Sequence, residues 1–175
     1  MIFEKSVILI FIPLIVALGI QDRVAKKADK AIIKFYDIEN FTKAVVTIDS
    51  IVNEETPSDF SKNNFFKIVY DNNFKGYGYI GNAASMTANF DYLILLDDSF
   101  TITKSQVLIY REEYGGEIGS KRWLKQFIGK KEGEELIHGK DIVAISGATI
   151  STTSMTSAIN DLLKSLAVIK SKGIQ

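Results

Sequence analysis

Short runs of strand-forming residues, separated by turn sequences, fill the middle of the chain and limit the folds that it can adopt. The runs are rich in β-branched, aromatic and other apolar residues, and they cover residues 44–52, 65–70, 77–80, 92–96 and 100–110. Asp71-Asn72-Asn73 and Asp97-Asp98-Ser99 are turn sequences that separate neighbouring runs. Because tight turns join antiparallel strands, these runs predict an antiparallel sheet.

Helical patterns flank the strand-forming runs. Apolar residues recur at helical spacing within residues 22–40 and again within residues 155–166. Residues 120–127 predict a short helix, with Ser120 as its N-cap and Gly129 as its stop. Strands in the middle with helices at the ends predict one α+β domain over residues 22–175, an antiparallel sheet with packed helices.

The N-terminus carries an apolar segment that predicts export or anchoring. Residues 7–20 hold no charged side chain, which is shorter than the about 20 apolar residues of a membrane-spanning helix. The length resembles the apolar region of a secretory signal, and Ala17 and Gly19 are small, as a cleavage site prefers. Residues 1–21 are therefore a signal peptide or a retained membrane anchor, and both place the domain outside the cytoplasm. A buried core helix is the remaining alternative.

The amino-acid composition limits the partners and the types of reactive site that the chain can have. Lys and Arg together number 21, as do Asp and Glu, so the formal net charge is zero and nucleic acid is not an expected partner. The chain has no cysteine and one histidine, which argues against thiolate chemistry, iron–sulfur clusters and histidine-rich metal sites. We interpret His138 as a solvated loop residue. We therefore expect any chemistry at this protein's site to come from a bound non-protein group rather than from its own side chains.

Residues 143–151 pass from an apolar, strand-like stretch through a small-residue turn into a hydroxyl-rich helix start. The Gly147-Ala148 step allows a close backbone approach, and a helix N-terminus offers free N–H groups to an anion. Thr149 adds a hydroxyl that can be esterified to a phosphate. From these residues alone, an ordinary strand-to-helix connection is the favoured interpretation, because Ser and Thr are common N-caps.

The same stretch resembles the Ser/Thr-Gly-Ala-Thr motif of FMN-binding domains. Such domains occur in the C subunit of the sodium-translocating NADH:quinone reductase, in the G subunit of Rnf electron-transport complexes and in stand-alone relatives. In that family the motif's Thr carries FMN through a phosphoester bond that a flavin transferase installs. The resemblance implies covalent FMN on Thr149, with neighbouring contacts from Ser146, Gly147, Ala148, Ile150 and Ser151.

A second stretch extends the resemblance upstream. Residues 115–119 and 123–130 are similar to the family's glycine loop and to its helix ending in Gln-Phe-x-Gly-Lys. This similarity implies flavin contacts from Tyr114, Gly115 and Gly116. The aromatic residues Tyr110 and Trp123 are further candidates to pack on the flavin ring, although core packing is the favoured role of Trp123.

Two positions depart from the family pattern. The family usually has Asp three residues before the motif, where this chain has Val143. Its glycine loop usually reads Glu-Thr-Pro-Gly-Leu-Gly, whereas here Glu113 is followed by Tyr114 and two glycines.

The resemblance implies an extracytoplasmic electron-transfer flavoprotein. Its expected partners are the membrane, subunits of a membrane redox complex, and a flavin transferase that matures it. Catalysis by side chains of the chain itself is not expected. Two alternatives stay open: a non-redox binding or scaffold module that keeps the fold without covalent flavin, and an FMN-dependent reductase that acts on a small molecule.

Overall fold

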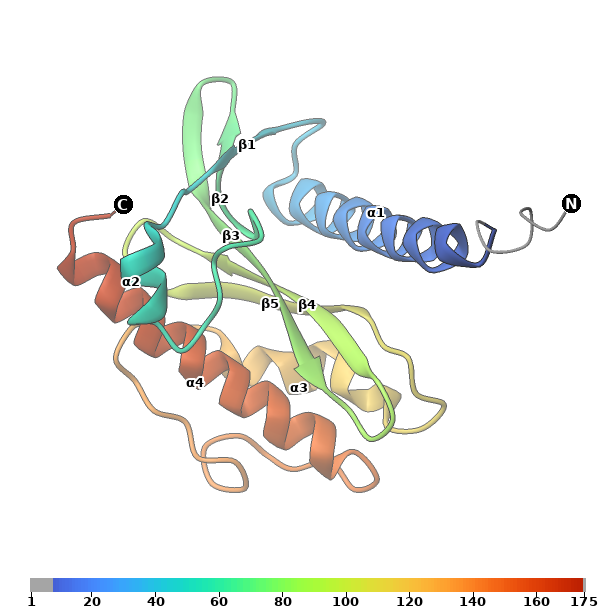
Figure 1. Ribbon diagram of the computed structural model, residues 1–175. Helices are drawn as coiled ribbons and strands as arrows, with labels where there is room; N and C mark the ends of the chain where they lie inside the picture. Colours follow the sequence, from blue (N-terminus) through green and yellow to red (C-terminus); the bar gives the residue numbers. More distant parts are fainter. Residues whose placement is uncertain (1–7, 175) are drawn as a thin grey trace, which may run out of the picture.

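The computed structural model describes residues 8–174, and an antiparallel sheet lies at its centre (Figure 1). The strands are β1 (Thr42–Val45), β2 (Phe65–Tyr70), β3 (Asn73–Ala84), β4 (Asn89–Leu96) and β5 (Ile102–Ile109). They lie in the sheet in chain order, and each pairs antiparallel with the next. The predicted antiparallel sheet is therefore confirmed.

Helices cover both faces of this sheet. They are α1 (Ile8–Tyr36), α2 (Ser50–Glu54), α3 (Lys121–Leu124) and α4 (Thr149–Ser171), with short 3₁₀ turns η1 (Gly116–Gly119) and η2 (Lys125–Phe127). The long helices α1 and α4 lie on opposite faces (Figure 1), which gives three layers. The predicted α+β class is confirmed.

Strand β4 contributes to both layers of core. Tyr92 and Ile94 point to the α4 side, whereas Leu93 and Leu95 point to the α1 side. All four side chains are at most 2% exposed. Because side chains alternate along a strand, an unbroken apolar run is what a strand covered on both faces requires.

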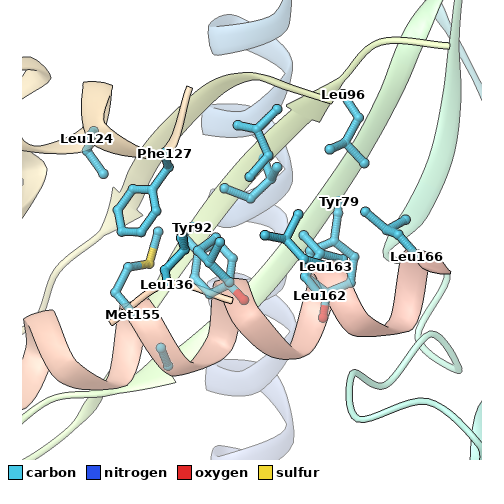
Figure 2. Packing of buried hydrophobic residues seen from close by; sticks show 14 of the residues in the cluster. Tyr79, Tyr92, Leu96, Leu124, Phe127, Leu136, Met155, Leu162, Leu163 and Leu166 are labelled. Atoms are coloured by element: carbon cyan, nitrogen blue, oxygen red, sulfur yellow. The ribbon is translucent and has the colours of Figure 1, made fainter. Parts of the chain in front are cut away.

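The α4 layer forms the larger core. The apolar stripe predicted for the C-terminal helix is fully buried, and it consists of Met155, Ile159, Leu162, Leu163 and Leu166. The stripe packs on sheet residues such as Tyr79, Tyr92 and Leu96 and on Phe127 from η2 (Figure 2). This core fixes the direction of α4 and so the place where the helix begins.

The α1 layer is built from the predicted amphipathic helix. Its buried residues are Val24, Ala28, Ala31 and Ile32. Helix α1 begins at Ile8 and ends at Tyr36, where Asp37 turns the backbone to a left-handed φ of 52°. The helix therefore continues without a break from the predicted export segment, residues 1–21, into the predicted domain, which starts at residue 22.

Part of the predicted export segment, residues 1–7, lies outside the described residues. Within residues 8–174, we found no helix with both the length and the apolar character that a membrane crossing demands.

The predicted strand over residues 44–52 is wrong beyond Val45. Strand β1 ends there, and α2 begins at Ser50 because the Asp49 carboxylate accepts a hydrogen bond from the Ile51 N–H at 2.9 Å. The intervening Val46 and Ile48 pack against the core without joining a strand. Their β-branched side chains reflect burial rather than strand pairing.

Candidate functional site

The start of α4 is a small-residue turn that leaves the helix uncapped. The Ala148 N–H donates to the Ile145 carbonyl at 3.1 Å, and Gly147 adopts a φ of 80°. Helix α4 begins at Thr149, and no side chain of the described part of the chain caps it. The N–H groups of its first turn are thus available to an external acceptor.

The stretch before this turn, residues 143–145, is not a strand, so the predicted strand-like run is wrong. Side chains hold its backbone: the Val143 N–H donates to Gln126 Oε1 at 2.8 Å, and the Trp123 indole N–H donates to the Val143 carbonyl at 2.7 Å. Trp123 itself is buried edge-to-face against Phe127. The favoured core role of Trp123 is therefore confirmed, and the helix ending in Gln-Phe-x-Gly-Lys supports the turn.

The glycine loop packs directly on the turn. Gly115 has a φ of 76°, and a Cβ at this position would lie 2.9 Å from the Ala148 Cβ and 3.2 Å from the Gly147 carbonyl oxygen. Only glycine fits both the backbone conformation and the available space. The two stretches that the sequence singled out are therefore in contact.

A cleft with a volume of about 260 Å³ opens between α4, the segment after β5 and the β3–β4 turn. Its lining residues are Met86, Tyr110, Glu112, Tyr114, Gly147, Ala148, Thr149, Ile150 and Ser151. Met86 and Tyr114 are 79% and 80% exposed, and Ile150 is 54% exposed. Large apolar side chains this exposed around one cleft indicate a surface for an apolar or aromatic group.

Tyr110 joins the end of the sheet to the first turn of α4. Its hydroxyl lies 3.0 Å from Ser151 Oγ, and its ring packs edge-to-face on Phe90. Ser151 is 3% exposed. This contact fixes the first turn of α4 against β5 and leaves Thr149, which is exposed, at the cleft.

The turn between β3 and β4 is fastened to the cleft by Glu112. One carboxylate oxygen accepts hydrogen bonds from Ser85 Oγ at 2.6 Å and from the N–H groups of Thr87 and Ala88 at 2.7 and 3.1 Å; the other accepts from Thr87 Oγ1 at 2.8 Å. These hydrogen bonds, led by that from Ser85, lower the pKa of Glu112 to about 2. Glu112 is thus a fixed negative charge, and it positions the turn that carries Met86.

His138 is not the solvated loop residue that we predicted. It is half-buried, its Nε2 lies 2.9 Å from Thr152 Oγ1, and its Nδ1 lies 3.4 Å from Thr153 Oγ1. The loop folds back on itself, because the Asp141 carboxylate accepts from the Ile137 N–H at 2.9 Å. His138 therefore braces the first turns of α4.

Comparison with known families gives a match that includes the cleft. Residues 86–164 match the model of the family described as FMN-binding domain. An FMN-binding domain is therefore recognised over residues 86–164. The matched residues include every residue that lines the cleft. No curated protein matches the chain.

Within the FMN-binding domain, the residues predicted to contact the cofactor fall into two groups. Six of them line the cleft: Tyr114, Gly147, Ala148, Thr149, Ile150 and Ser151. Gly115 packs behind the turn, Gly116 opens η1, and Ser146 is exposed within the turn. The latter three support the cleft wall or flank it.

Sequence reasoning missed Met86 and Glu112 as cleft residues. Both reach the cleft through the pairing of β3, β4 and β5, which places the β3–β4 turn beside the end of β5. In the sequence, these contacts are indicated only by the hydroxyls of Ser85 and Thr87, which are spaced to bind one carboxylate. This spacing can be interpreted only once the strand pairing is known.

The groups that line the cleft are chemically suited to FMN. The apolar side chains of Met86, Tyr114 and Ile150 suit an aromatic ring system, and the uncapped start of α4 suits a phosphate. The cleft is smaller than the ~300–1,000 Å³ of pockets that enclose a drug-sized ligand, so a flavin ring bound there would stay partly exposed. No Lys or Arg is among the described residues that line the cleft, which leaves backbone N–H groups as the phosphate's partners.

Proposed function

We propose that this protein is an extracytoplasmic electron-transfer flavoprotein whose FMN is esterified to Thr149. The observation that carries the proposal is the position of Thr149. It is the first residue of α4, it is exposed, and it lines the cleft of an FMN-binding domain. A transferase can reach such a hydroxyl without unfolding the chain.

The electrostatics of α4 support a phosphoester at this position. A phosphodiester keeps one negative charge, and the positive end of a helix stabilises such a charge by about 0.3–1 kcal/mol near the surface. The covalent bond removes the need for a cationic side chain to retain the cofactor.

The chain's own residues then position and cover the cofactor. FMN supplies the electron chemistry when bound, because its ring accepts electrons singly or in pairs. Met86, Tyr114 and Ile150 offer apolar surface that shields part of the ring from water. Tyr110 and Ser151 hold the first turn of α4 in place.

We further propose that the domain works outside the cytoplasm, beside subunits of a membrane redox complex. The uncharged N-terminal segment, residues 7–20, supports export or anchoring. A ring that is partly exposed in an open cleft supports electron exchange with a partner. N-terminal sequencing of protein recovered from the extracytoplasmic fraction distinguishes a removed signal from a retained anchor.

The covalent link is tested by producing the protein with a flavin transferase of this family, denaturing it, and measuring flavin fluorescence on the protein band. We expect fluorescence from the wild type and from Thr149→Ser, and none from Thr149→Ala. Ser157→Ala is the control, because Ser157 is an exposed hydroxyl-bearing residue about two turns further along α4, and it should label normally. Colour that is lost on denaturation would leave FMN binding intact and refute the ester.

One observation favours a second candidate, a scaffold module with the same fold and no covalent flavin. Val143 is 64% exposed at the position where the resemblance calls for Asp. If a transferase reads that carboxylate, Val143→Asp should label faster than the wild type under limiting enzyme. A wild type that stays unlabelled while Val143→Asp is labelled would support the scaffold module.

A further inference from the structure

We propose that Glu112 lowers the reduction potential of the flavin by holding a fixed negative charge in the cleft. The inference rests on the proposed function, since it requires FMN at Thr149. It assigns to Glu112 a role beyond fastening the β3–β4 turn.

The charge inventory of the cleft singles out Glu112. Among the described residues that line the cleft, it is the only one with a side chain that is ionised at neutral pH. The adjacent cation, Arg111, is committed elsewhere: its guanidinium donates to the Asp91 carboxylate and to the Asn89 carbonyl, both at 2.6 Å. The negative charge of Glu112 is therefore not cancelled by Arg111.

The hydrogen bonds keep this charge in place. Four donors from the β3–β4 turn hold the two carboxylate oxygens, so the side chain cannot swing out to solvent without breaking them. The same bonds lower its pKa to about 2, so the group stays ionised at neutral pH.

A fixed negative charge acts on the redox equilibrium through Coulomb repulsion. Uptake of two electrons and one proton leaves the reduced ring with one negative charge more than the oxidised ring. The Glu112 carboxylate therefore destabilises the reduced form relative to the oxidised form, which lowers the midpoint potential. Because the cleft is open to solvent, added salt should weaken this effect.

Glu112→Gln tests the role of charge with little structural change. The amide oxygen can accept the three bonds made to the first carboxylate oxygen, and the amide nitrogen can donate to Thr87 Oγ1. Glu113→Gln is the matched control: it removes the same charge from the neighbouring residue, which does not line the cleft. Ser85→Ala loosens the turn and keeps the charge.

The measurement is spectroelectrochemical titration of the flavin-loaded protein at neutral pH and low salt. We expect the midpoint potential to shift upward in Glu112→Gln, and to shift much less in Glu113→Gln and Ser85→Ala. The difference between wild type and Glu112→Gln should shrink as KCl is raised. If Glu112→Gln does not fold, Glu112→Ser is the second neutral variant, and it must show the same upward shift.

The outcomes separate the two proposals. Wild type that takes up FMN with the same potential as Glu112→Gln would overturn this inference alone. Equal shifts in Glu112→Gln and Ser85→Ala would also overturn it, because the cause would then be the loosened turn. Failure of the wild type to take up FMN would overturn the proposed function and this inference together.

Discussion

At the scale of single residues, Gly115 connects the two motifs of the site. Its left-handed φ of 76° and its contact with Ala148 leave no room for a side chain. A left-handed conformation costs a non-glycine residue about 1–3 kcal/mol. Overpacking against a fixed neighbour adds a cost of similar size.

Gly115→Ala should therefore destabilise the fold by about 2–6 kcal/mol, the sum of the strain and the overpacking. Gly133→Ala is the matched control, because Gly133 has a similar φ of 81° with nothing within 4 Å of an added Cβ. Urea unfolding measures both variants. Equal losses of unfolding free energy would show that the contact with the turn contributes nothing.

At the scale of elements, the segment from α3 through η2 serves as the support of the turn. Its side chains bind both backbone polar groups of Val143: Gln126 accepts from the N–H, and Trp123 donates to the carbonyl. The stretch before the turn thereby obtains hydrogen bonds that a neighbouring strand would otherwise supply.

Gln126→Ala should cost about 0.5–1.5 kcal/mol, the net contribution of one hydrogen bond, because the exposed Val143 N–H loses its acceptor. Amide exchange at Val143 should become faster, and flavin labelling at Thr149 should become slower as the turn loosens. Lys125→Ala is the control, since Lys125 is exposed and its stability change should stay within about 0.5 kcal/mol. Unchanged exchange at Val143 would contradict the supporting role.

The sequence predicts elements well where one physical signal dominates. Residues 65–70 match β2 at both ends, since β-type residues meet a turn in which Asp71 and Asn72 adopt φ values of 51° and 59°. The stripe of α4 is equally clear.

The strand predictions failed at residues 44–52 and 143–145 for different reasons. Val46 and Ile48 pack on the core without pairing in a strand. Val143 is exposed, and its backbone N–H and carbonyl bond to side chains of Gln126 and Trp123 instead of to a neighbouring strand.

At the scale of the whole molecule, two apolar layers share one sheet. β4 belongs to both layers, so loss of packing in the α1 layer is expected to reach the α4 layer. The cleft also depends on the pairing of the strands in this sheet. Met86 and Glu112 reach it only through strand pairing, which explains why no local pattern in the sequence could have placed them there.

Ile32→Ala tests whether the layers unfold together. Ile32 is fully buried between α1 and the sheet, and its truncation should cost about 2–5 kcal/mol. Ile33→Ala makes the same change at a half-buried position and should cost less. Trp123 fluorescence reports the α4 layer, because the chain has a single tryptophan.

In Ile32→Ala, the fluorescence transition and the far-UV circular dichroism transition should move to lower urea together. A fluorescence midpoint that stays at the wild-type position while the dichroism midpoint moves would mean that the layers unfold independently.

The exposed position of Thr149 has a consequence for the order of events in the life of the protein. Modification of an exposed hydroxyl displaces no packed side chain, so the two apolar layers can form before any cofactor arrives. Synthesis and loading can then be separated in time. Under the proposed ester at Thr149, the folded, unloaded protein is itself the substrate of the loading step.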